Sequence, residues 1–177
     1  MAQQPRIHDI FEPVTGTWQY VVADPVTSRA VIIDSVLDYD PASQVITTKA
    51  ADFLLALIDE NGYHIDRILE THAHADHLTA ASYLQSRLGR TQGEKPLIGI
   101  GKRIVQVQDV FGQRYGVPAD EYNAVFDTLF EDDETFDIGD IKGTAIHLPG
   151  HTPDHLGYII GGNMRLNLIC RRKRTRG

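Results

Sequence analysis

The sequence lacks the features that several classes of protein require. Its single cysteine, Cys170, excludes an internal disulfide framework and fits a reducing compartment. No apolar run approaches the roughly 18 residues that are needed to cross a membrane. The N-terminus, Met1 to Arg6, contains no apolar signal-peptide core, and acidic residues follow at Asp9 and Glu12. We therefore expect an intracellular protein, cytoplasmic or mitochondrial, with no membrane partner.

Acidic residues are also absent after Asp154, whereas six of the 17 Lys and Arg residues lie between positions 165 and 176. Residues 1–160 therefore carry a net charge of −13, and residues 161–177 carry +6. An acidic body offers no electrostatic surface for nucleic acid, so we expect no nucleic-acid partner. The tail at 161–177 has no clear period, and we expect its basic end, Arg171 to Gly177, to be disordered.

The remaining composition is that of one globular domain, which we place at residues 1–160. Of the 177 residues, 42% are hydrophobic and 23% are charged, which is enough to bury a core. Residue patterns predict strands at 17–23, 29–34, 65–70, 97–100, 135–138, 142–147 and 156–160. They predict helices at 49–60 and 78–88, and a weaker helix at 103–111.

Four side chains that can bind a metal lie within six residues: His72, His74, Asp76 and His77. The predicted strand before them and the predicted helix after them place the cluster on a tight turn at a sheet edge. Imidazole suits Zn, Cu, Fe or Ni, and a carboxylate among imidazoles favours a hard or borderline ion. The alternative is a solvated polar loop, but such a loop has no need of three histidines. The pattern therefore predicts a metal site.

A second segment that could bind metal follows the strand at 142–147. In the run Leu148-Pro149-Gly150-His151-Thr152, a sharp turn presents His151 directly after a strand, as at His72. We therefore add His151 to the candidate ligands. Four further histidines are isolated in the sequence, and we expect them to be structural or solvated: His8, His64, His147 and His155.

Together, His72-x-His74-x-Asp76-His77 and the run at 148–152 resemble the metallo-β-lactamase superfamily, from about Ile7 to about Ile160. Within it, residues 71–79 are most similar to the persulfide dioxygenases, iron enzymes that oxidise glutathione persulfide with O₂ to sulfite and glutathione. The resemblance implies an α/β fold, an αβ/βα sandwich in which two sheets pack between helices. It also implies one Fe(II) per chain, held by His72 and His151 as catalytic residues, and leaves a homodimer open.

In the resembled family, a carboxylate ligand comes from an Asp in a strand after the position of Ile160. This sequence has no Asp or Glu there. We therefore expect that the family's C-terminal part is missing and that an unrelated basic tail replaces it, as truncation, a frameshift or altered splicing could produce. Such a chain should be poorly soluble and nearly inactive.

Two alternatives remain open. A glutathione thioester hydrolase of the glyoxalase II type would hold two zinc or mixed metal ions. Its first ion would take His72, His74 and His151, and its second would take Asp76 and His77 with ligands that are absent. The other alternative is an inert fragment whose basic tail serves as an interaction segment.

Overall fold

The computed structural model describes residues 4–74, 77–123, 125–161 and 164–166. The strands are β1 (Arg6–Glu12), β2 (Thr17–Ala23), β3 (Arg29–Ile33), β4 (Val36–Asp40), β5 (Val45–Thr47), β6 (His64–Leu69), β7 (Leu78–Thr79), β8 (Leu97–Gly101), β9 (Thr128–Phe130), β10 (Thr135–Ile138), β11 (Ile141–His147), β12 (Leu156–Ile160) and β13 (Met164–Leu166). The helices are α1 (Lys49–Asn61), α2 (Ala81–Gln92), α3 (Ile104–Tyr115) and α4 (Ala119–Tyr122).

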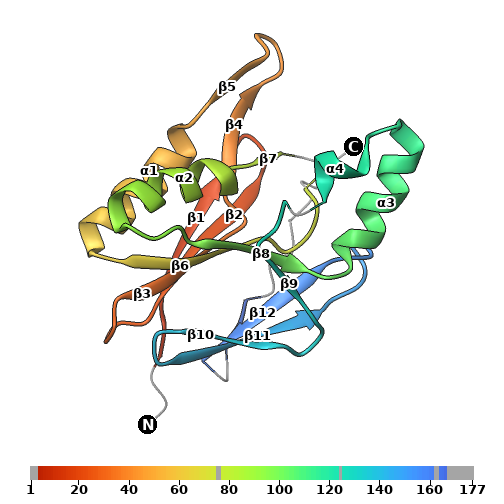
Figure 1. Ribbon diagram of the computed structural model, residues 1–177. Coiled ribbons are helices and arrows are strands. Elements are labelled where there is room, and N and C mark those ends of the chain that lie inside the picture. The colour runs from red at the N-terminus through yellow and green to blue at the C-terminus, as the bar shows by residue number, and fades with distance from the viewer. Residues whose placement is uncertain (1–3, 75–76, 124, 162–163, 167–177) are drawn as a thin grey trace, which may run out of the picture.

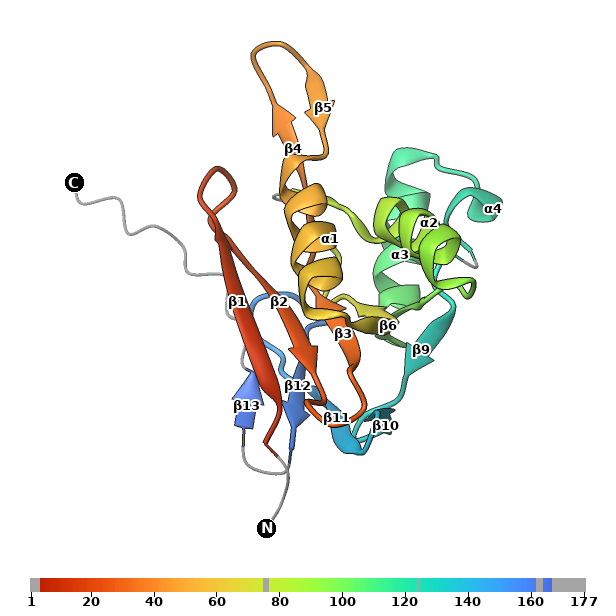
Figure 2. The ribbon, with the colours of Figure 1, turned by 90° about the vertical axis from the view of Figure 1, so that its left-hand side faces the viewer.

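Two sheets form the body of the protein (Figure 1). The first has the order β1-β2-β3-β6-β8-β9, with its last four strands parallel to one another. The second is antiparallel, in the order β10-β11-β12-β13. A small third sheet, β5-β4-β7, includes the hairpin of β4 and β5, which projects away from the body (Figure 2).

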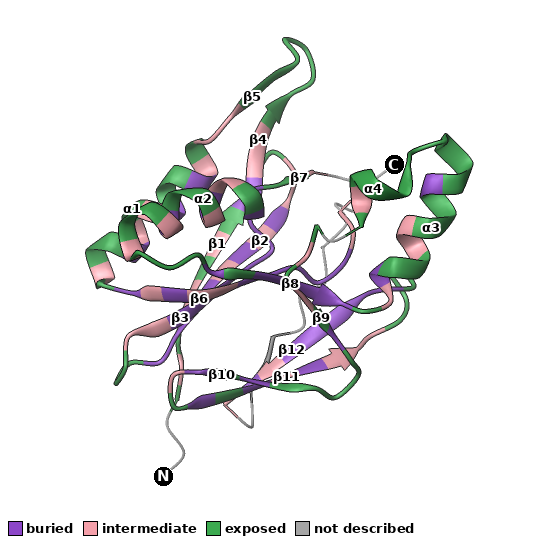
Figure 3. Cartoon of the chain, viewed as in Figure 1, coloured by how far each residue is buried: buried purple, intermediate pink, exposed green. Residues whose placement is uncertain are grey.

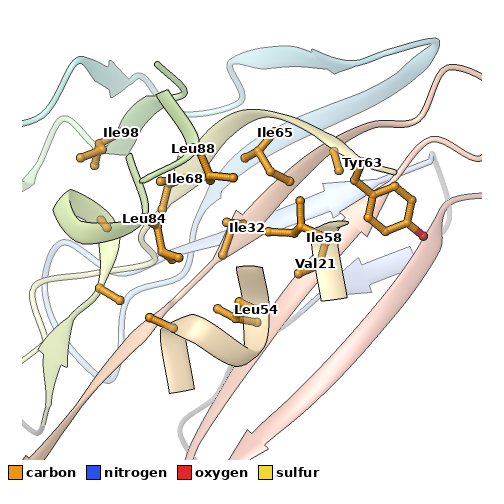
Figure 4. Packing of buried hydrophobic residues seen from close by; sticks show 14 of the residues in the cluster. Val21, Ile32, Leu54, Ile58, Tyr63, Ile65, Ile68, Leu84, Leu88 and Ile98 are labelled. Atoms are coloured by element: carbon orange, nitrogen blue, oxygen red, sulfur yellow. The ribbon is translucent and has the colours of Figure 1, made fainter. Parts of the chain in front are cut away.

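One core lies between the first sheet and the helices α1 and α2 (Figure 4). Leu54 of α1 and Leu84 of α2 are fully buried against this face of the sheet. In α1 the C-terminal Gly62 adopts the left-handed conformation at φ 66°, which glycine takes without steric cost. The helix predicted at 49–60 therefore matches α1, which ends one residue later.

A second core fills the space between the two sheets. The residues of β3 alternate between the two cores: Ala30 and Ile32 face the helices, whereas Val31 and Ile33 face the second sheet. All four are fully buried, so this central strand is covered on both faces (Figure 3). The predicted α/β sandwich is confirmed, with α1 and α2 on the outer face of the first sheet.

Some local predictions need correction. The helix expected at 78–88 begins at Ala81, because Leu78 and Thr79 form β7 and pair with β4. The sequence analysis also missed β1, β4, β5, β9 and the short α4. The sequence analysis predicted no strand after residue 161, whereas Met164–Leu166 form β13, whose backbone pairs with β12. The expected disorder at Arg171 to Gly177 lies outside the described residues. No described helix is both long and apolar enough to span a membrane.

Candidate metal site

The site begins where two neighbouring parallel strands of the first sheet end. Asp34 follows β3, and Glu70 follows β6, which is paired with β3 in parallel. The backbone N–H of Asp34 donates to the carbonyl of Leu69 at 3.0 Å, so the pairing continues up to the site. Because parallel strands end at the same sheet edge, the sequence positions 34 and 70–74 meet there.

Asp34, Thr71 and His72 form a chain of buried hydrogen bonds. The Thr71 hydroxyl donates to Asp34 Oδ2 at 2.8 Å and also lies 2.8 Å from His72 Nδ1. Since the only hydroxyl proton goes to the carboxylate, the hydroxyl accepts from His72, whose proton must then be on Nδ1. Nε2 of His72 is left with a free lone pair, the form in which an imidazole binds a metal.

His74 is held between two carboxylates. Its Nε2 lies 3.1 Å from Asp34 Oδ1 and 2.9 Å from Glu70 Oε2, and the Glu70 carboxylate also accepts from the Thr79 hydroxyl. Burial opposes the charged imidazolium, but the two carboxylates outweigh it and raise the pKa of His74 to about 10. Without a bound metal, His74 is therefore a cation at neutral pH, and only its Nδ1 remains for another partner.

The neighbouring groups respond to burial and to this cation. Burial, aided by the His74 charge, lowers the pKa of His72 to about 4, so His72 is neutral at pH 7. Burial raises the pKa of Glu70. It acts in the same direction on Asp34, but the His74 charge and hydrogen bonds from His74 and Thr71 outweigh it, so the pKa of Asp34 is lowered.

The second sheet contributes the loop between β11 and β12. The ring centroid of His151 lies 4.8 Å from that of His72, and the ring of His155 is also 4.8 Å from His72. Two imidazoles that each bond one ion at about 2.0–2.1 Å place their centroids roughly 5 Å apart. His72 and His151 are therefore close enough to share an ion, as the metal hypothesis requires.

Three hydrogen bonds join this loop and strand β12 to the histidine segment. The Leu156 N–H donates to the Thr71 carbonyl at 2.7 Å, and the Ala73 N–H donates to Asp154 Oδ2 at 2.9 Å. The hydroxyl of Tyr158 donates to the carbonyl of Glu70 at 2.9 Å. The two sheets are thus fixed relative to each other at the site by direct protein contacts.

The side chains present fit a metal ion. His72 offers the lone pair of its Nε2, and the buried Nδ1 of His155 has no hydrogen-bond partner among the described residues. Ligand atoms of Asp34, Glu70 and His74 also lie within 4.8 Å of one another. Because the contacts of His74 Nε2 with both carboxylates have hydrogen-bond lengths, we interpret this triad as the support of the site.

The predicted ligands differ in where the structure places them. It brings His72, His74 and His151 together, and it places the ring of His77 4.1 Å from that of His74. Asp76 lies outside the described residues. These assignments stay predictions.

The expectation of isolated histidines holds for some positions only. His8 contacts the Tyr63 hydroxyl. His147 contacts the carbonyl of Pro153, in the same β11–β12 loop that carries His151. In contrast, His155 is buried against His72 and His151. The sequence analysis gave no role to Glu70 or Asp154, and it placed Asp34 only as the last residue of the predicted strand at 29–34. Each of the three is a polar residue beside a strand end.

The site histidines lie together where the two packed sheets meet. This arrangement defines the class of protein as a metal-dependent α/β sandwich. Residues 13–163 match the metallo-beta-lactamase superfamily, and the chain belongs to this metal-dependent superfamily. It is 41% identical over 160 residues to a "Beta-lactamase hydrolase-like protein" of Xylella fastidiosa, covering 90% of this chain and 36% of that protein. It is 39% identical to "Glyoxylase B2" of Dictyostelium discoideum, covering 90% of this chain and 54% of the relative.

Weaker similarity links the chain to persulfide dioxygenases. It is 27% identical over 154 residues to the human "Persulfide dioxygenase ETHE1, mitochondrial", covering 87% of this chain and 47% of that protein. The crystal structure of ETHE1 from Myxococcus xanthus has the same fold, with a TM-score of 0.64 and 21% identity over 88% of this chain and 54% of that one. The chain thus spans between about a third and about half of the length of these relatives.

Proposed function

We propose that this chain carries the metal site of a persulfide dioxygenase, an iron enzyme that converts glutathione persulfide, O₂ and water into glutathione and sulfite. In this reaction the sulfur–sulfur bond breaks, and the outer sulfur gains two oxygen atoms from O₂ and one from water. That sulfur loses the four electrons that O₂ takes up, and glutathione leaves as the thiol. The similarity to the human persulfide dioxygenase and the histidine pattern support the proposal.

The observation that carries the proposal is the difference in hydrogen bonding between His72 and His74. The Thr71 contact leaves the lone pair of His72 on Nε2, and the ring of His151 lies 4.8 Å from that of His72, close enough for both to bind one ion. His74 is instead committed through Nε2 to Asp34 and Glu70. Two free imidazoles suit one Fe(II) ion with open positions, whereas a two-metal site needs more ligands.

Each residue then has a defined task. His72 and His151 would hold the ion, which supplies coordination sites for the persulfide sulfur and for O₂. Thr71 and Asp34 fix the orientation and protonation of His72, which are the usual tasks of groups behind a metal ligand. His151 is exposed and His72 is buried, so substrate would approach from the side of His151.

A second candidate function is thioester hydrolysis at a two-metal site. It is favoured by the similarity to "Glyoxylase B2" and by the rings of His74 and His77, which lie 4.1 Å apart beside the first pair. In that case a bound metal would lower the pKa of a water molecule toward neutrality. His74 would have to contribute through Nδ1.

Metal content and product analysis test the proposal. The purified chain would be loaded anaerobically with Fe(II) or with Zn(II), and bound metal would be counted by mass spectrometry. We expect one ion per chain. We expect the iron form to produce sulfite and consume O₂ in equal amounts with glutathione persulfide, at a low rate because no Asp or Glu follows Ile160 to supply the family's carboxylate ligand. His72→Gln should lose both metal and sulfite formation, and His8→Gln, at a histidine that contacts Tyr63 rather than the site, is the matched control. Two bound ions with thioester hydrolysis and no sulfite would refute the proposal in favour of the hydrolase.

A further inference from the structure

A cleft of about 330 Å³ lies at the opposite end of the first sheet from the metal site. It is found where β3, β6 and β8 begin, whereas the metal site lies where β3 and β6 end. Since β6 has six residues, at about 3.3 Å for each residue, roughly 20 Å of strand separate the two places. The volume is at the lower end of the range for pockets that bind small molecules, so the cleft suits a small ligand.

Arg67 is the residue of this cleft that needs a partner. It stands in register with Val31 of β3, which is fully buried between the two sheets, so both side chains lie on the inner face of the first sheet. Arg67 is only partly exposed, and its guanidinium makes no ion pair or hydrogen bond within the described part of the chain. Because an arginine cannot lose its charge in a protein, partial burial without a counter-charge costs free energy. A bound anion would offset that cost.

The acidic side chains of the cleft do not supply this counter-charge. Asp66, next to Arg67 in the sequence, is held by Arg29, which donates from Nε to one carboxylate oxygen at 2.9 Å and contacts the other with a terminal nitrogen. Asp137 of β10 forms an ion pair with a lysine of β11. Glu94 is exposed in the loop before β8 and makes no ion pair with any described residue. The charge of Arg67 is therefore left for a ligand.

Two further donors, Lys95 and His64, line the same cleft. Neither side chain has an ion pair or a hydrogen bond to another described residue. The stem of Lys95 crosses α2 at Gly89, where a β-carbon would come within 2.7 Å of Lys95 Cγ. The Gln92 side chain bonds both the N–H and the carbonyl of Ile65, at 2.8 and 3.0 Å, and so fixes the end of α2 to the start of β6. Direct contacts thus hold the walls of the cleft in place.

We propose that this cleft binds a small ligand through one oxyanion, a phosphate or a carboxylate group, with Arg67 as the main contact and Lys95 beside it. A guanidinium holds either group through two parallel hydrogen bonds, and an ammonium adds a point charge. The exposed Glu94 limits the positive charge of the cleft, which favours a ligand with one anionic group over a polyanion. Because the length of β6 lies between the cleft and the metal site, the proposal does not depend on the proposed function.

Titration of the 177-residue chain with inorganic phosphate and, separately, with acetate tests the proposal. NMR would follow the arginine Nε–H signals and the backbone signals of residues 64–67, at an ionic strength kept constant with NaCl. We expect the Arg67 signal to shift and to saturate, and the anion that binds more tightly identifies the group. Arg67→Gln should weaken binding by about tenfold or more, because the lost hydrogen bonds are charge-assisted. Arg90→Gln, at an exposed arginine of α2 outside the cleft, is the matched control and should bind as wild type.

The signals of the wild-type chain keep the test decisive if a variant misfolds. An Arg67 signal that shifts without saturation, or no more than the signal of Arg90, would mean an adventitious ion only and would overturn the proposal. A folded Arg67→Gln chain that binds both anions as tightly as wild type would overturn it as well. Saturable binding at Arg67 in a chain that holds no metal would support the cleft and leave the proposed function to its own test.

Discussion

Replacing Thr71 with valine tests how the protein prepares His72 for a metal. Valine keeps the shape of threonine but removes the hydroxyl that donates to Asp34 and accepts from His72, both at 2.8 Å. Thr71 is fully buried, so no water replaces the lost contacts. The backbone N–H of residue 71 can still donate to Asp34 Oδ1. The change is therefore confined to the link between the carboxylate and the imidazole.

The size of the effect follows from the two lost bonds. A hydrogen bond to a charged acceptor contributes about 1.5–3 kcal/mol and a neutral one about 0.5–1.5 kcal/mol. We therefore expect Thr71→Val to lower the free energy of unfolding of the metal-free chain by about 2–4.5 kcal/mol. Loss of a supporting group behind a ligand weakens metal binding by about 10–100-fold. At about 1.4 kcal/mol per tenfold, this is about 1.4–2.8 kcal/mol of binding free energy.

Two assays measure these quantities. Urea denaturation followed by circular dichroism gives the free energy of unfolding, and Co(II) titration gives the affinity. Thr71→Ser is the matched control, because it keeps the hydroxyl, and it should bind Co(II) within about threefold of wild type. Nitrogen-15 NMR of the metal-free chain should find the proton of His72 on Nδ1. A proton on Nε2, or a Thr71→Val chain that binds as tightly as the serine variant, would refute the reasoning.

Two further predictions concern stability. Asp24 accepts hydrogen bonds from the Thr27 hydroxyl and from the backbone N–H groups of Asp140, Val26 and Thr27. Burial alone would raise the pKa of Asp24, but these hydrogen bonds outweigh it and lower the pKa. Asp24→Asn should therefore cost about 1–3 kcal/mol in urea denaturation at pH 7. A carboxyl whose pKa is lower in the folded than in the unfolded state, where it is about 3.9, stabilises the fold above that pH, and this stabilisation is lost as pH falls through the folded-state pKa. The free-energy cost of Asp24→Asn should therefore shrink toward pH 3. A cost that does not change with pH would contradict this prediction. Leu84→Ala should cost about 2–5 kcal/mol in the same assay, since Leu84 is fully buried between α2 and the first sheet, whereas alanine at the exposed Val110 should be nearly neutral.

Regular elements were predictable where one local pattern determines them. Local sequence predicts three of them: β2 from its apolar run, β10 from its alternation of apolar and polar residues, and the end of α1 from its glycine. Local sequence does not predict the start of α2. The helical spacing of Leu84 and Leu88 was identified correctly, but Leu78 and Thr79 pair with β4, some forty residues earlier in the sequence. A long-range strand pairing of this kind overrides local propensity and cannot be derived from a single window of sequence.

The site was predictable only where its residues cluster in the sequence. His72 and His74 stand two residues apart, so their pattern is visible directly. Asp34 and His155 become neighbours of these histidines only because β3 pairs with β6 and because the second sheet packs on the first. An acidic residue at a strand end and a lone histidine are each common in loops. The tertiary pairing, rather than the residue type, gives them a place in the site.

The hydrogen bonds between the two sheets bear on how metal binding and folding are related. Leu156 and Tyr158 of β12 donate to the carbonyls of Thr71 and Glu70, so the segments that present His72 and His155 are joined by contacts that require no ion. A site assembled in this way exists before the metal arrives, unlike a zinc finger, which is unfolded without its ion. A metal that binds only the folded chain then adds stability by mass action, in proportion to the logarithm of its free concentration over Kd. The chain should accordingly unfold cooperatively with or without metal, and the metal should shift the midpoint of unfolding without changing the steepness of the transition.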